Sequence, residues 1–246
     1  MDLSLRKGNN HCNIKFSKCL PGKYRISNMP ILAMKNSIVE FTHEFYLQEI
    51  TVSLGLYEFV FDKPYTEMGP LIPEKMNYPW HSIDFREVQE FLAALNKIVI
   101  ENGYSFSLDI PTIAEWEHAL LCGKDMEWSW GNNDDELYNY GWFIDNSEDK
   151  IHHSKQKKPN EWGLYDMYGN VYEYCYDIIN ENESSYFKNP SKKEPEFLGV
   201  MPCMGGSFDS SLENCKGYNL MGYRNMYIEP TGIRLIIREH KFDVRE

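Results

Sequence analysis

The sequence predicts an α+β fold in which short strands of mixed, mostly antiparallel sheets combine with two to three short helices and long loops. Residues 22–26 and 39–47 show the period-2 alternation of half-buried strands. The segment after Asp84 instead shows the periodicity of an amphipathic helix. Aromatic residues form 15% of the chain, which indicates a packed core. We expect an irregular lead-in at residues 1–20 and one domain at residues 21–240.

Two helices are predicted from their ends and their apolar spacing. The first follows Thr51 or Ser53, because either side chain can cap a helix N-terminus. The second begins at Asp84, which forms a capping pair with Glu87, and it ends near Gly103. Its buried face is expected to contain Val88, Phe91, Leu92, Leu95 and Val99.

A third helix begins at Thr112, which forms a T-x-x-E capping box with Glu115. We expect His118, on this helix, to be a surface or boundary residue. The chain then becomes loop-like for some thirty residues after Gly131. Strands return at residues 197–201, 205–208 and 233–238.

Composition excludes several classes of function. The formal net charge of −12 argues against binding to nucleic acid or to anionic membrane surfaces, both of which need clustered basic residues. No apolar run approaches the ~20 residues of a membrane span, and residues 1–8 contain no signal-peptide core, so we expect a cytoplasmic protein. The six cysteines form no C-x-x-C pair and are expected to be free thiols.

Residues 162–177 have the composition of a buried, irregular turn that leads into a strand. Glycines punctuate this segment, and aromatic residues that need a core occur throughout it. Asp166 and Glu173 could supply carboxylates, and Gly169 and Val171 carbonyls, to a Ca²⁺ ion. Alternatively, both acids cap backbone N–H groups in a tight turn.

Five motifs in order resemble the formylglycine-generating enzyme (sulfatase-modifying factor) family, over about residues 20 to 238. They are Ile110-Pro-Thr-Ile-Ala-Glu-Trp-Glu-His-Ala119, Trp128-Ser-Trp-Gly131, Trp162-Gly-Leu-Tyr-Asp-Met-Tyr-Gly-Asn-Val-Tyr-Glu-Tyr174, Gly205-Gly-Ser-Phe208 and Gly232-Ile-Arg-Leu235. The resemblance implies a C-type-lectin-like fold. It also implies a structural calcium ion at Asp166, Gly169, Val171 and Glu173.

The resemblance also gives a test for catalysis. Oxygen-dependent enzymes of the family bind copper(I) through two cysteines that follow the Gly-Gly-Ser motif, and these thiols convert a substrate cysteine to formylglycine. The equivalent positions here are Ser210 and Cys215. Because a hydroxyl cannot replace a thiolate as a ligand of this soft ion, we expect no copper and no such oxidase chemistry.

The sequence leaves three functions open. The first is a non-catalytic module that binds a protein or small-molecule ligand, similar to the retroelement-diversified receptors that share this fold. The second is a divergent metal-dependent oxidase or oxygenase acting on a cysteine or another thiol, and the third is a structural subunit of a larger assembly. The ligand face of the binding module would comprise Ser207, Asp209, Ser210, Asn214, Cys215, Tyr218, Asn219, Tyr223 and Asn225.

Overall fold

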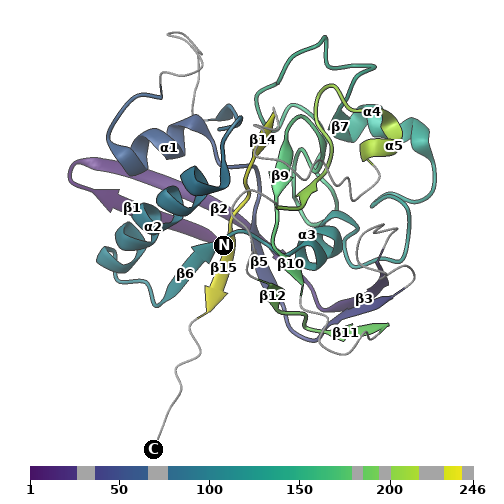
Figure 1. Cartoon of the computed structure of the whole chain (residues 1–246), viewed down its shortest axis with the longest axis horizontal. Coiled ribbons are helices and arrows are strands. Elements are labelled where there is room, and N and C mark those ends of the chain that lie inside the picture. Colours follow the sequence, from purple (N-terminus) through teal and green to yellow (C-terminus); the bar gives the residue numbers. More distant parts are fainter. Residues whose placement is uncertain (27–36, 66–76, 179–184, 194–200, 216–229, 240–246) are drawn as a thin grey trace, which may run out of the picture.

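The structure, a computed structural model, describes residues 1–26, 37–65, 77–178, 185–193, 201–215 and 230–239 (Figure 1). Its largest sheet has five antiparallel strands in the order β1-β2-β5-β15-β6. The strands are β1 (Asp2–Lys7), β2 (Asn10–Cys19), β5 (Phe45–Gln48), β15 (Ile236–Glu239) and β6 (Phe106–Asp109). Near the end of the described chain, β15 therefore lies inside the sheet, between two strands that precede it by a hundred residues or more.

The prediction of an irregular lead-in at residues 1–20 is wrong. These residues form the β1–β2 hairpin, with Leu3 opposite Ile14 and Leu5 opposite Cys12. Both strands alternate buried and exposed residues, so one face of the hairpin packs on the core. The N-terminal segment is thus part of the main sheet.

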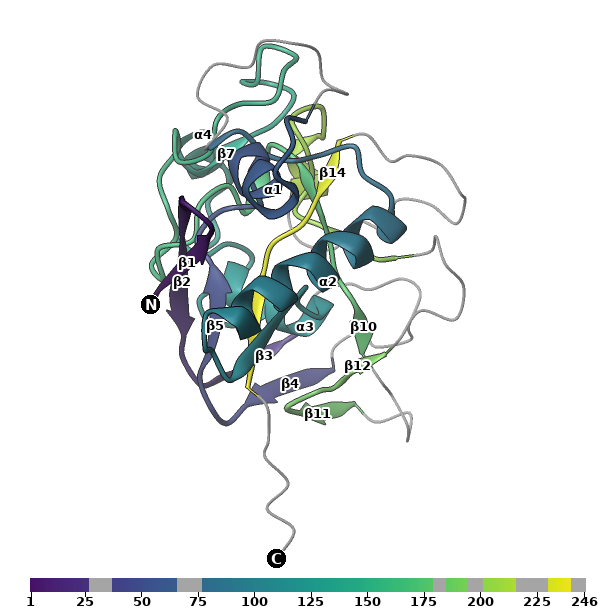
Figure 2. The same cartoon turned by 90° about the vertical axis from the view of Figure 1, so that its left-hand side faces the viewer.

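Three helices were expected, and the structure confirms their N-termini. Ser53 caps α1 (Leu54–Phe61), and Asp84 and Thr112 each form a complete capping box at α2 (Phe85–Glu101) and α3 (Ile113–Leu120). α1 and α2 lie over the β1–β2–β6 region of the main sheet, and α3 lies beside β10 (Figures 1 and 2). A 3₁₀ helix, η2 (Asp134–Glu136), and two single-turn helices, α4 (Leu137–Tyr140) and α5 (Leu212–Cys215), occur in the loops.

Among the described residues, four smaller sheets complete the fold, and they correct several strand boundaries. Two have three strands: β11 (Tyr186–Lys188), β4 (Ile38–Phe41) and β3 (Gly22–Arg25), and β13 (Cys203–Met204), β9 (Tyr172–Tyr174) and β14 (Thr231–Gly232). Two have two strands: β7 (Gly141–Trp142) with β8 (Tyr168–Gly169), and β10 (Asp177–Ile178) with β12 (Lys192–Lys193). The predicted strand at 39–47 is therefore divided between β4 and β5.

The predicted strand at 205–208 is also wrong. Gly205 and Gly206 have φ angles of +92° and +75°, a left-handed conformation that glycine adopts without strain, and they form a turn after β13. The predicted strand at 233–238 is interrupted between β14 and β15. Most of the strand predicted at 197–201 lies outside the described residues.

The core contains two hydrophobic clusters. The first joins α1 and α2 to β1, β2 and β6, and the second surrounds α3. His118 belongs to α3 and is fully buried, so its predicted surface position is wrong. All six cysteines are buried and free, as expected. In the described part of the chain, no helix has both the length and the apolar character that crossing a bilayer would require.

Candidate functional site

A buried ion pair between Glu173 and Arg234 lies at the centre of the family motifs. Arg234 Nε donates to Glu173 Oε2 at 2.9 Å, and Nη2 donates to Oε1 at 2.6 Å. The side chains are 1% and 0% exposed. The planar guanidinium and carboxylate groups thus meet in a bidentate pair that solvent does not reach.

Neighbouring groups complete the bonding of this pair. Trp116 Nε1 donates to Glu173 Oε2 at 2.6 Å, and Arg234 donates to the backbone carbonyls of Gln48 and Tyr165, each at 2.9 Å. Five segments are involved: α3, β9, the end of β5, the segment after β14 and the loop before β8 that contains Tyr165. Burying charges is costly unless they are paired and hydrogen-bonded. Because the charges of this cluster are paired and hydrogen-bonded, the cluster is a structural pin that holds these segments together.

Asp166 is the second acid of the predicted calcium turn, and its surroundings differ. It is 3% exposed and has a left-handed backbone, with φ of +55°. Oδ2 accepts from the Lys155 N–H at 3.0 Å, whereas Oδ1 has no hydrogen-bond partner in the structure. Burial raises the pKa of Asp166 to about 6, against the opposing effects of the Lys155 N–H and Arg234.

These contacts test whether the four predicted calcium residues fit the ion. Glu173 does not fit, because N–H donors of Arg234 and Trp116 occupy both of its carboxylate oxygens. Asp166 fits better, since it has a buried oxygen without a partner. The described residues contain no group of three or more His, Cys, Asp or Glu side chains arranged for a metal. Calcium at Asp166 with the Gly169 and Val171 carbonyls stays a prediction.

The turn after Gly-Gly holds the first predicted ligand residues. The Ser207 N–H donates to Ser210 Oγ at 2.9 Å, and Ser210 Oγ lies 2.7 Å from the hydroxyl of Tyr172. The Ser207 hydroxyl bonds Asp209 and lies 3.0 Å from Ser210 Oγ. Ser207 and Ser210 are buried, so their hydroxyls stabilise the turn, whereas Asp209 is exposed.

Cys215 ends α5 and packs against this turn. A Cβ atom added at Gly206 would lie 2.9 Å from Cys215 Sγ, which shows how closely the thiol approaches the backbone. Cys215 is 0% exposed, and burial raises the pKa of its thiol to about 12. The thiol of Cys203 belongs to the other hydrophobic cluster. At neutral pH both thiols are therefore protonated and separate.

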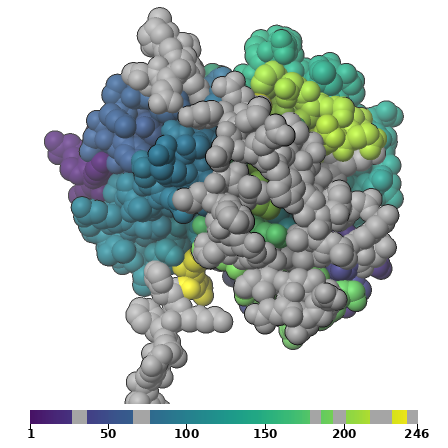
Figure 3. All heavy atoms as spheres, viewed as in Figure 1, coloured from purple at the N-terminus to yellow at the C-terminus, as the bar shows by residue number. Residues whose placement is uncertain are grey.

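The surface beside this turn comes from two parts of the chain. The Ile144 N–H donates to the Ser210 carbonyl at 3.0 Å, and Ile144 itself is 59% exposed. In Figure 3 the yellow-green residues around α5 lie on the surface next to teal residues of the α4 region. Asn214 is exposed on α5. Tyr218, Asn219, Tyr223 and Asn225 lie outside the described residues.

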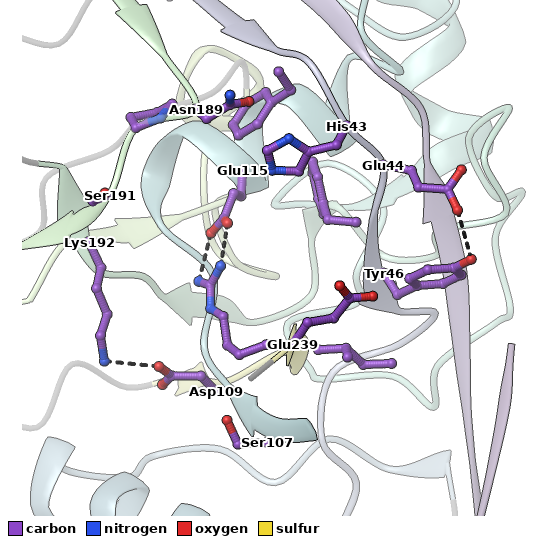
Figure 4. Close-up of a pocket in the computed structure, with 15 residues that line it drawn as sticks. His43, Glu44, Tyr46, Ser107, Asp109, Glu115, Asn189, Ser191, Lys192 and Glu239 are labelled. Atoms are coloured by element: carbon purple, nitrogen blue, oxygen red, sulfur yellow. Dashed lines mark hydrogen bonds and ion pairs between the residues drawn. The ribbon is translucent and has the colours of Figure 1, made fainter. Parts of the chain in front are cut away.

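A cavity of about 580 Å³ lies elsewhere, around the end of β15 that points away from β14. Figure 4 shows its polar lining, which comes from the β4–β5 loop, β6, α3, β15 and the segment before β12. Two ion pairs lie in its wall: Arg238 with Glu115, and Lys192 with Asp109 at 3.0 Å. No local sequence pattern indicates this cavity, because its residues are scattered from Phe41 to Glu239.

The sequence matches the model of a known protein family over most of its length. The family model described as "Sulfatase-modifying factor enzyme 1-like domain" matches residues 24–239. This chain belongs to that family. The resemblance inferred from the motifs is therefore confirmed. The sulfatase-modifying-factor domain covers the described strands from β4 to β15 and leaves the β1–β2 hairpin before it.

Solved structures confirm the C-type-lectin-like fold expected for this family. "Treponema denticola variable protein 1" has a TM-score of 0.74 at 22% identity, covering 97% of this chain and 99% of its own. PvdO from Pseudomonas aeruginosa has a TM-score of 0.67 at 15% identity, with 96% and 98% covered. CarF has a TM-score of 0.61 at 14% identity, with 92% and 98% covered. At these identities the likeness concerns the fold alone.

A curated relative matches over a shorter stretch. It is "Chaperone protein LppX" from Paenibacillus barcinonensis, 35% identical over 101 residues. The aligned stretch spans about a third of each chain, 34% of this one and 34% of the relative. The activity of that whole protein therefore says little about the present chain.

Proposed function

We propose that this chain is a non-catalytic binding module built on the sulfatase-modifying-factor scaffold. The observation that supports it is the pair of positions equivalent to the family's copper ligands. Ser210 supplies a hydroxyl that bonds Tyr172 and the Ser207 N–H, and Cys215 supplies a sealed, protonated thiol. Only one of the two positions carries sulfur, whereas the family's copper(I) chemistry uses two thiolates.

The proposed ligand face begins at the exposed residues Asp209 and Asn214 and continues through the Tyr- and Asn-rich sequence that follows. Tyrosine provides a large rigid contact area and asparagine provides adaptable hydrogen bonds, a combination typical of binding surfaces. A near-identical template repeat of the DNA encoding residues 207–227, beside the gene, would support retroelement diversification.

Copper binding is the direct test of the non-catalytic proposal. The purified chain is incubated with Cu(I) and a competing chelator, and bound copper and oxygen consumption with a thiol substrate are measured. We expect neither stoichiometric copper nor oxygen consumption. One copper per chain, with oxygen consumption that is lost on Cys215→Ser, would support the divergent oxidase instead. Ser210→Cys is the gain-of-function control, since it restores the second sulfur.

Binding is tested by selecting peptides from a random library against the intact chain. We expect the selected peptides to lose at least tenfold in affinity for a Tyr218→Ala/Tyr223→Ala variant, about 1.4 kcal/mol. Tyr186→Ala is the control, because this tyrosine is exposed and lies on β11, away from α4 and α5. Peptides that bind all three proteins equally would reject this face.

A further inference from the structure

The cavity at the end of β15 has an unequal charge balance. Its lining contains four carboxylates, from Glu44, Asp109, Glu115 and Glu239, and two basic side chains, from Lys192 and Arg238. Three of the acids already have a cationic partner. Arg238 bonds Glu115, Lys192 bonds Asp109, and Lys18, from outside the lining, bonds Glu44 at 2.9 Å.

Glu239 is the remaining acid. It is exposed, and the structure records no hydrogen bond or ion pair to its carboxylate from any described residue. In the view of Figure 4, the Glu239 side chain lies between Glu115 on one side and the Glu44–Tyr46 pair on the other. Its position gives the cavity one negative charge that no described residue pairs.

Aromatic side chains form one wall of the same cavity. Phe41, Phe45 and Tyr46 line it, and the rings of Phe41 and Phe45 lie 5.3 Å apart. Aromatic faces attract cations and also cover apolar stems. A cavity lined by both a carboxylate and such rings therefore favours a molecule that carries a positive charge on a short hydrocarbon chain.

Other ligand classes fit this lining less well. An anion would meet an excess of carboxylates, and both basic groups are already neutralised by acids. A metal ion would find one free carboxylate and no grouping of three metal-binding side chains among the described residues. The cavity volume falls within the range of about 300 to 1,000 Å³ that small-molecule sites occupy.

We propose that this cavity binds a small organic cation of the alkylguanidine or alkylamine class, with Glu239 as its counter-ion and the half-buried rings of Phe45 and Tyr46 as the wall that covers its stem. A guanidinium group suits the site best, because its planar fork matches a carboxylate and stacks on aromatic rings. The cavity lining shares no residue with the proposed ligand face, so either proposal can fail without the other.

The test uses n-butylguanidinium as the probe, titrated into the intact chain by calorimetry and ligand-observed NMR. Two matched probes separate charge from shape: n-butylurea, which is neutral with nearly the same shape, and pentanoate, which is anionic. We expect saturable binding of the guanidinium that weakens with added salt, and at least tenfold weaker binding of the other two. Equal binding of n-butylurea or stronger binding of pentanoate would overturn the proposal.

Two variants assign the binding to this cavity. Glu239→Gln removes the unpaired charge from an exposed position and should lower the affinity for the guanidinium probe about fivefold. Lys192→Met should raise the affinity for the same probe severalfold, because the substitution removes a competing cation and frees Asp109. Glu148→Gln is the control, since it makes the same charge change on an exposed loop residue outside the lining. Unchanged affinity in Glu239→Gln, with normal thermal stability, would contradict the assignment.

Discussion

Two arginines near the end of the chain, Arg234 and Arg238, each form a bidentate pair with a glutamate, yet their surroundings differ. The Glu173–Arg234 pair is 0–1% exposed, and backbone carbonyls and an indole satisfy its remaining atoms. The Glu115–Arg238 pair forms the wall of an open cavity, with Arg238 30% exposed. The same two chemical groups thus fix the fold where they are sealed and line an open cavity where solvent reaches them.

The largest expected effect comes from breaking the sealed pair. Arg234→Met leaves the buried carboxylate of Glu173 without its counter-ion, and we expect a loss of about 3–5 kcal/mol in the free energy of unfolding. Urea denaturation at neutral pH measures it. The double variant Glu173→Met/Arg234→Met should recover part of the loss, because no buried charge is left alone. A loss below about 1 kcal/mol in the single variant would show that the pair is not a structural pin.

Asp166, beside the sealed pair, should make stability depend on pH. Its pKa is about 6 in the folded chain and 3.8 as the ordinary value. Between these pH values the folded state holds a proton that the unfolded state releases. The contribution of protonated Asp166 to the free energy of unfolding is therefore complete below pH 3.8 and is lost as the pH rises through 6. The resulting loss in the free energy of unfolding is at most about 3 kcal/mol.

The comparison that isolates this effect is the wild-type chain against Asp166→Asn. Asparagine keeps an acceptor for the Lys155 N–H but carries no charge. We therefore expect the stability of the variant to increase relative to that of the wild type as the pH rises from 4 to 7. Thermal unfolding in EDTA measures the difference. If added Ca²⁺ raises the thermal stability of the wild-type protein alone at pH 7, the predicted ion at this residue is supported. Parallel curves of stability against pH for the two proteins would contradict the shifted pKa.

The smallest effect is expected at the open pair. Arg238→Met should cost about 1 kcal/mol, because the pair is partly solvated and Glu115 still accepts from the Thr112 N–H at 2.8 Å. Chemical denaturation alongside Arg234→Met checks the ranking. If the two arginine variants lose equal stability, burial does not distinguish these pairs.

Local signals in the sequence predicted the helix starts correctly. Ser53, Asp84 and Thr112 cap their helices because capping depends on residues within one turn. The β1–β2 hairpin was missed although its signals were present, since Leu3, Leu5, Cys12 and Ile14 alternate on either side of a Gly-containing turn. That alternation is short, and polar residues dominate the rest of the segment.

Contacts between distant residues explain what the sequence could not give. The carboxylate of Glu173 was assigned to calcium because its neighbours in the turn supply oxygens, whereas its real partner comes 61 positions later. His118 was expected near the surface, but packing against Tyr24, Phe41, Phe45 and Trp162 buries it. The Figure 4 cavity combines five separate segments, so no local pattern could reveal it.

The position of β15 has a consequence for how the protein is made. β15 pairs with β5 on one side and with β6 on the other, and it leaves the ribosome after both of them. Until then two strand edges lack a partner, which exposes the nascent chain to aggregation and to chaperone capture. Translation products that stop before Ile236 should therefore accumulate as insoluble or chaperone-bound species, even though they contain every helix described.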